Sequence, residues 1–155
     1  MQLTRYTDYS LRVLIYLAIQ DKGTRSTIGK IAEHFDIPKN HLVKVVHHLG
    51  KLGYIRTTRG KNGGIDLAKR PEQIGVGDIV RDMENSLKIV DCQLPSSCPI
   101  LPVCLLPSIL AKASDAFLNV LDQYTVAELT NQSSALKSLL GTGNKLLRID
   151  ATIID

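Results

Sequence analysis

The sequence lacks several features that would place it in a common functional class. It has no apolar run of about 18 residues, the length that a membrane-spanning helix needs. Its first residues, Met1 to Asp8, lack the apolar core and small-residue cleavage site of a secretion signal, so we expect a cytoplasmic protein. It has no P-loop, dinucleotide-binding glycine fingerprint or nucleophile elbow. We therefore do not expect an enzyme.

The sequence is also poor in cysteine, with three among its 155 residues. An odd number of cysteines in a cytoplasmic chain argues against a disulfide framework. Hydrophobic residues make up 44% and charged residues 22%, a balance that excludes global disorder. This length accommodates one compact domain, or a small domain with an oligomerisation element.

The net charge of +4 hides two halves of opposite sign. Residues 1–70 carry 13 Lys and Arg against 5 Asp and Glu, a net charge of +8. Residues 71–155 carry 6 against 10, a net charge of −4. Solvated surface charges alone could produce this bias, but a basic half joined to an acidic half also fits a polyanion-binding head on a separate body.

The first half has the spacing of three helices followed by a hairpin. Apolar residues recur at helical intervals: Leu11, Leu14, Ile15 and Ala18, then Ile28, Ile31, Ala32 and Phe35, then Leu42, Val45, Val46 and Leu49. Ser26 or Thr27 can cap the second helix, and Pro38 suits the first position of the third. Strand-like runs at 54–58 and 65–68 flank a glycine-rich turn. These elements predict a winged helix-turn-helix.

The second half predicts a helix over 76–84, an irregular proline-rich segment over 91–107, and a long helix after it. The spacing of Thr125 and Glu128 is that of a capping box, which starts a further short helix. The expected fold is mainly α, a winged helix-turn-helix with a two-stranded wing and a long C-terminal dimerisation helix. Its expected divisions are a DNA-binding domain (1–70), a connecting helix and cysteine loop (71–104), a dimerisation helix with a short following helix (105–131), and a tail of unknown role (132–155).

The basic residues of the first half lie where a winged helix contacts double-stranded DNA. A helix fits the major groove, and side chains near its N-terminus reach base edges. The candidate contacts are Thr27, Lys39, Asn40, His41, Lys44, Arg59 and Lys61. We expect base contacts from Asn40 and Lys44 and a phosphate contact from Lys39. Arg59 and Lys61, in the hairpin turn, could enter or clamp the minor groove.

All three cysteines lie in the proline-rich segment, as Cys92, Cys98 and Cys104. Thiolates select zinc or iron–sulfur clusters. Zinc sites usually contain closely spaced cysteine pairs, and none is present here. Even, wider spacing favours an iron–sulfur cluster, of the two-iron (2Fe-2S) or four-iron (4Fe-4S) type, with a weaker fourth ligand.

With these features together, the sequence resembles the nitric-oxide-sensing NsrR repressors, within the wider group of IscR-like iron–sulfur regulators. The matching segments are Met1–Thr4 with Thr7–Tyr9, the helix Asn40–Val46, the turn Arg59–Ile65 and the cysteine loop. The resemblance covers residues 1 to about 131. It implies a homodimer held by the long helix, at about 105–123, and cluster ligation by the three cysteines. It also implies nitric oxide as the effector. Asp8, supplied by the other subunit, occupies the position that completes the coordination in some relatives.

Three alternatives stay open at this stage. A related regulator could sense iron–sulfur status or redox stress through the same cysteines. The chain could be an electron carrier, or a DNA-binding module stapled by zinc. The sequence leaves the operator, the cluster type and the role of the tail undetermined.

Overall fold

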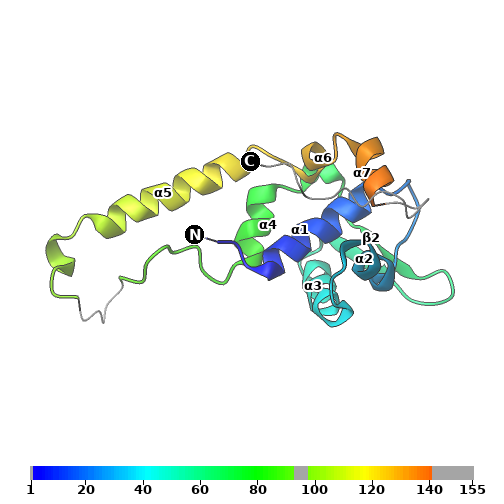
Figure 1. Ribbon diagram of the computed structural model, residues 1–155, viewed down its shortest axis with the longest axis horizontal. Coiled ribbons are helices and arrows are strands. Elements are labelled where there is room, and N and C mark those ends of the chain that lie inside the picture. The colour runs from blue at the N-terminus through cyan, green and yellow to red at the C-terminus, as the bar shows by residue number, and fades with distance from the viewer. Residues whose placement is uncertain (1, 93–97, 141–155) are drawn as a thin grey trace, which may run out of the picture.

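A computed structural model describes residues 2–92 and 98–140 of the chain (Figure 1). Seven α-helices lie in these ranges: α1 (Arg5–Ala18), α2 (Ile28–Phe35), α3 (Lys39–Lys51), α4 (Val76–Met83), α5 (Leu106–Leu121), α6 (Val126–Leu129) and α7 (Ser133–Leu139). They are accompanied by two strands, β1 (Ile55–Thr58) and β2 (Gly64–Leu67), and by two single 3-10 turns, Pro71–Gln73 and Leu101–Val103. The predicted mainly α winged-helix fold is confirmed.

The reading head consists of α1, α2, α3 and the β1–β2 hairpin, packed around one apolar core. Buried side chains from every part of the head meet there: Val13, Leu14, Tyr16, Leu17, Ile31, Ile37, Leu42, Val45, Val46, Leu49, Tyr54, Ile55 and Ile65. The core continues through Ile74, Ile79, Met83 and Val126, so α4 and α6 pack on the same core. Burying each such side chain contributes roughly 1.5–3 kcal/mol, which makes this core the main support of the head.

The ends of several elements differ from the expectation by one or two residues. Pro38 is the N-cap of α3 and not its first residue, and Glu84 is the C-cap of α4. Pro107 lies in the first turn of α5, where proline needs no backbone donor, so the irregular segment ends earlier than expected. A single 3-10 turn also interrupts that segment at Leu101–Val103.

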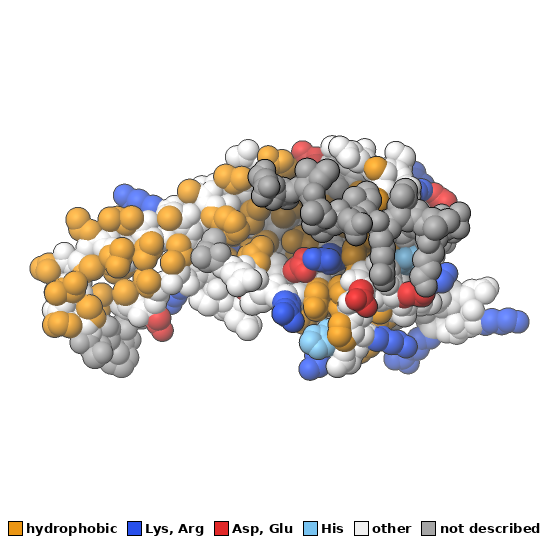
Figure 2. Space-filling view, in the orientation of Figure 1, with side chains coloured by type: hydrophobic (Ala, Val, Ile, Leu, Met, Phe, Trp, Pro, Cys, Tyr) orange, Lys and Arg blue, Asp and Glu red, His pale blue; other side chains and the backbone are white. Residues whose placement is uncertain are grey.

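The helix α5 extends away from the reading head as a long arm (Figure 1). Leu118 is the single buried residue among those of α5. Apolar residues recur at helical spacing along α5, and two of them, Ile109 and Val120, are 57% and 53% exposed. Apolar side chains cover much of the arm in the space-filling view (Figure 2). The apolar stripe of this helix is therefore largely uncovered in the single chain.

The tail beyond Gln132, which showed only a weak pattern, begins with α7. Leu140, the C-cap of α7, packs against the edge of the core, and Lys137 forms an ion pair with Asp21 after α1 at 2.8 Å. The apolar residues Ile149, Ile153 and Ile154 lie outside the described residues. Over residues 2–92 and 98–140, no helix has the length and apolar character needed to cross a membrane.

Candidate nucleic-acid interface and cysteine loop

The helix α3 has one buried and one exposed face. Leu42, Val45 and Leu49 are fully buried, which fixes the rotation of the helix in the head. The four predicted contacts on this helix, Lys39, Asn40, His41 and Lys44, are all exposed as a result. Their side chains lie on the first turn and a half, the part of a reading helix that reaches base edges.

The N-terminal turns of α1 contribute to the same surface. Arg5, Tyr6 and Tyr9 line a hollow of 140 Å³ together with Asn40, His41 and Lys44. The Tyr6 hydroxyl donates a hydrogen bond to the Lys44 carbonyl at 3.2 Å, and the Tyr9 and His41 rings meet edge to face. Sequence reasoning missed Arg5, because its proximity to α3 depends on how α1 crosses that helix.

Thr27 and the wing flank the reading helix. Thr27 caps α2 by accepting a hydrogen bond from the Lys30 amide at 3.2 Å, which leaves its hydroxyl proton for a phosphate oxygen. Arg59 and Lys61 lie exposed between β1 and β2, as predicted for a wing tip. All seven predicted DNA contacts are thus exposed on the reading head.

The wing is held in place by backbone pairing with the residue before Thr27. The Ser26 amide donates to the Ile65 carbonyl at 3.0 Å, and the Ile65 amide donates to the Ser26 carbonyl at 2.8 Å. Gly64 permits this close approach, since a Cβ on it would lie 2.6 Å from the Ser26 oxygen and its φ is +156°. The wing and the start of α2 are therefore positioned as one unit.

The cysteine loop joins α4 to α5. Cys92 and Cys104 are half-buried and Cys98 is exposed. Cys92 lines a 550 Å³ groove between residues 85–92 and α5, whose walls include Leu87, Leu110 and Leu118. Accessible thiols on an irregular segment, beside an apolar wall, are a donor set that fits an iron–sulfur cluster.

The single chain does not assemble a complete ligand set. Within the described ranges, no three His, Cys, Asp or Glu side chains are grouped as metal ligands would be. The structure therefore does not bring Cys92, Cys98, Cys104 and Asp8 together, and their assignment as ligands stays a prediction. Asp8 lies in the first turn of α1, and the Arg12 guanidinium donates to its carboxylate at 2.9 and 3.0 Å.

A partly buried corner joins α1 to the start of the cysteine loop. Glu84 Oε1 accepts hydrogen bonds from the Thr4 amide at 2.7 Å, the Thr4 hydroxyl at 3.0 Å and the Thr7 hydroxyl at 2.5 Å. Burial raises the pKa of Glu84, but these bonds outweigh it and hold the pKa below the ordinary 4.5. The carboxylate thus fixes the N-terminus of α1 to the end of α4.

Two of the four histidines, His34 and His48, make ring contacts inside the reading head. His34 stacks on Tyr16, and His48 packs on Tyr6 with its Nδ1 3.2 Å from the Tyr6 hydroxyl. These contacts orient α1 against α2 and α3.

Comparison with known proteins finds a matching family model and similar proteins. The family model Rrf2, described as an iron-dependent transcriptional regulator, matches residues 3–132. The chain is 48% identical over 142 residues to the HTH-type transcriptional regulator NsrR of Shouchella clausii, covering 90% of this chain and 95% of that protein. The solved structure of CymR, the global cysteine regulator of B. subtilis, is similar with a TM-score of 0.67 and 25% identity, over 85% of this chain and 98% of that one. T. potens IscR is similar with a TM-score of 0.69 and 25% identity, over 92% and 94%.

Proposed function

Since the chain belongs to the Rrf2 family of iron-dependent transcriptional regulators, we propose that it is a repressor whose operator affinity depends on an iron–sulfur cluster that reacts with nitric oxide. The family resemblance inferred from the sequence is confirmed, and the chain is a transcriptional regulator and not an enzyme. The observation that carries the proposal is the placement of the cysteines, on the loop that joins α4, which packs on the core of the reading head, to the α5 arm.

The reading head supplies the DNA contacts in this proposal. Asn40 and Lys44 would donate hydrogen bonds to base edges in the major groove, because both are exposed near the start of α3. Lys39, His41 and Thr27 would contact the flanking backbone, which fixes the register without reading sequence. Arg5 would extend this phosphate-binding surface onto α1, and Arg59 and Lys61 would reach the adjacent minor groove.

The exposed stripe on α5 supports a homodimer. Apolar residues on a helix that stands away from the head would remain in water in the single chain, at a cost of about 25 cal/mol per Å². Covering Ile109 and Val120 by the same helix of a second copy would remove that cost for both copies at once. Two reading heads would then bind two half-sites of one operator.

Cys92, Cys98 and Cys104 would hold the cluster through their thiolates, with Asp8 of the other subunit as the fourth ligand. A bound cluster would supply the iron atoms with which nitric oxide reacts. The carboxylate of Asp8 has a second partner in Arg12, so it is not left uncompensated when it is not a ligand. Exchange between these two partners would tie the position of α1 to the state of the loop.

The decisive experiment uses protein purified without air. Iron and sulfide counts and the visible spectrum report the cluster, and DNA selected by the loaded protein from a random-sequence pool reports binding. We expect the cluster-loaded protein to bind the selected DNA tightly and to bind it more weakly after titration with nitric oxide. The proposal would be contradicted if protein without iron or cluster bound the same DNA as tightly as the loaded protein, and if nitric oxide did not change that binding.

Two variants separate the two parts of the proposal. Cys98→Ala should abolish the chromophore, whereas Lys44→Ala should keep it and weaken DNA binding. The runner-up function, a regulator that senses iron–sulfur status, predicts release of DNA on chelation with no response to nitric oxide. Colourless protein loaded with zinc would favour the zinc-stapled module instead.

A further inference from the structure

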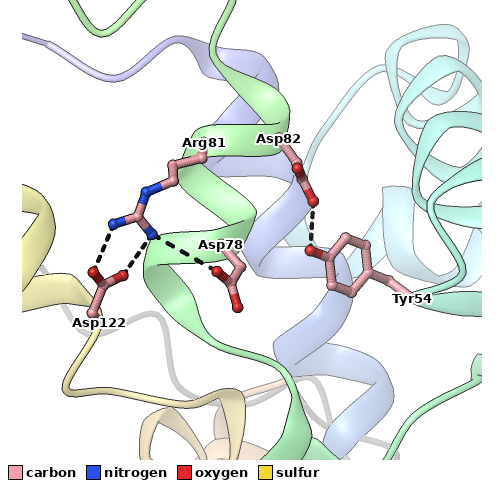
Figure 3. A network of polar contacts seen from close by, with 5 residues as sticks. All are labelled: Tyr54, Asp78, Arg81, Asp82 and Asp122. Carbon is pink, nitrogen blue, oxygen red and sulfur yellow. Dashed lines mark hydrogen bonds and ion pairs between the residues drawn. The ribbon is translucent and has the colours of Figure 1, made fainter.

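The short helix α4 bonds to three different parts of the molecule through residues near its C-terminal end. Glu84 accepts hydrogen bonds from Thr4, the N-cap of α1, and from Thr7 in its first turn. Asp82 accepts a 2.5 Å hydrogen bond from the Tyr54 hydroxyl, in the turn between α3 and β1. Arg81 points to the opposite side and meets Asp122, the C-cap of α5 (Figure 3). One helix therefore contacts both the reading head and the arm.

The contact between Arg81 and Asp122 is a bidentate ion pair. The Arg81 Nη1 and Nη2 atoms each lie 2.6 Å from one of the two Asp122 carboxylate oxygens (Figure 3). Asp78 Oδ1 lies 3.7 Å from Arg81 Nη1. The hydrogen bond from Arg81 lowers the pKa of Asp122. Both side chains are 39% exposed, and such pairs add little to stability. What the planar two-bond geometry does fix is the direction of one helix relative to the other.

Gly77 provides the space in which this pair sits. A Cβ on Gly77 would overlap the Asp122 Oδ1 atom and would lie 3.0 Å from Arg81 Nη1. Gly77 is buried inside α4, where alanine would be the better helix former. A glycine at this position is disfavoured by the helix and is suited to the ion pair.

Backbone hydrogen bonds fix the same end of α5 to the start of α4. The Val76 amide donates to the Tyr124 carbonyl, and the Val126 amide donates to the Ile74 carbonyl, both at 2.9 Å. The other end of α5 follows Cys104, and the chain that leaves Glu84 leads to Cys92. Both ends of the cysteine loop are thus connected to α4, one directly and one through the length of α5.

We infer that Arg81 and Asp122 are positioning residues that transmit the orientation of the α5 arm through α4 to the reading head. A change in the cysteine loop moves the near end of α5, and the ion pair makes α4 follow the far end. The hydrogen bond from Tyr54 to Asp82 then carries the movement of α4 to the end of α3. This inference rests on the proposed function, since it needs a DNA affinity that depends on the loop.

The test measures one ratio for each full-length variant: the DNA affinity of the cluster-loaded protein divided by that of the cluster-free protein. The ratio of each variant is compared with that of the wild type. Arg81→Gln, Asp122→Asn and Gly77→Ala should each reduce the wild-type ratio by at least about fivefold, the lower end of common coupling strengths. Iron content and visible spectrum should remain those of the wild type in all three variants, and Tm should remain so in Arg81→Gln and Asp122→Asn, because both side chains are partly exposed. Gly77→Ala is the mildest of the three, since it displaces the carboxylate without removing a charge.

Two further variants complete the design. The reciprocal exchange, Arg81→Asp with Asp122→Arg, should restore at least part of the ratio. Asp21→Asn removes another exposed ion pair, the one with Lys137, and should leave the ratio unchanged.

If the single variants keep the wild-type affinity ratio, the inference is overturned and the proposed function is not affected. Variants that lose iron or melt early, with no recovery in the exchanged pair, would also overturn it, because the role would then be structural. A wild-type ratio of one would remove the inference together with the proposed function.

Discussion

Single polar residues at the ends of helices determine how the parts of this chain are joined. Glu84 is the clearest case, because one carboxylate oxygen accepts three hydrogen bonds from the start of α1. A hydrogen bond to a charged acceptor contributes more than a neutral one, about 1.5–3 kcal/mol when well shielded. The corner is only partly shielded, so its contribution lies at or below the low end of that range.

Replacing this carboxylate should change the pH dependence of stability. The pKa of Glu84 is lowered in the folded chain, so its contribution is present above the ordinary value of 4.5 and is lost as pH falls through the folded value. Glu84→Gln should cost about 1 kcal/mol at pH 7, and the difference from wild type should shrink below pH 4.5. Urea unfolding between pH 3 and 7 measures this, with Glu33→Gln on α2 as the control. A difference that stays constant over that range would contradict it.

The charged end of Lys44 gives a second prediction at this scale. The residue is exposed on α3 beside Arg5, and we expect it to contact a base edge. Lys44→Ala should weaken binding to the selected DNA by about 1–3 kcal/mol and relax the preference at one base position. Binding assays with all four bases at each position test this. Lys112→Ala, on the arm, should have no such effect, and an equal loss in both variants would argue against a specific contact.

The residues that the sequence could not identify are those whose partners lie far along the chain. Local signals were sufficient for the Thr125–Glu128 capping box, and they limited the cap of α2 to Ser26 or Thr27, of which the structure has Thr27. Arg81, by contrast, meets Asp122 only because α4 and the end of α5 pack together. No local pattern encodes that contact, and the role of Gly77 follows from the same packing.

At the scale of elements, the hydrophobic period predicted α5 correctly but not its surroundings. An apolar stripe usually indicates a face buried in the same chain. Here the face remains exposed on an arm, which supports the proposal that a second copy covers it (Figure 2). The wing was easier to predict, because glycines can adopt the positive φ angles of a hairpin turn, as Gly60 and Gly64 do here.

A charge within the exposed apolar stripe of α5 should therefore separate the subunits. Ile109→Glu places an unpaired carboxylate at the surface that we propose to be covered by a second copy, which opposes association. We expect the sedimentation coefficient of the variant to be that of a monomer and its DNA affinity to fall at least tenfold. Asn119→Glu adds the same charge at an exposed polar position of α5 outside the apolar stripe, serves as the matched control and should remain dimeric. A dimeric Ile109→Glu variant would place the interface elsewhere.

At the scale of the whole molecule, the opposite charges of the two halves coincide with two structural parts. The net charge of +8 over residues 1–70 belongs to the reading head, and α4 to α7 lie in the acidic remainder. The head therefore attracts a polyanion, while the acidic part is repelled by it. This arrangement favours an orientation in which α3 and the wing face the DNA.

Binding driven by this charge distribution must weaken steeply with salt. If a dimer neutralises six to eight phosphates, the logarithm of the affinity should fall with the logarithm of salt concentration with a slope of roughly −5 to −7, because each neutralised phosphate releases condensed counterions. Lys61→Ala, at the wing tip, leaves one phosphate per subunit without its cation and should make the slope less steep by about one for each such phosphate. Lys112→Ala on α5 should leave the slope unchanged, because the arm lies away from the surface that we expect to face DNA. Fluorescence anisotropy across a salt series measures all three proteins, and a slope near zero for the wild type would mean that the basic head does not bind the phosphate backbone.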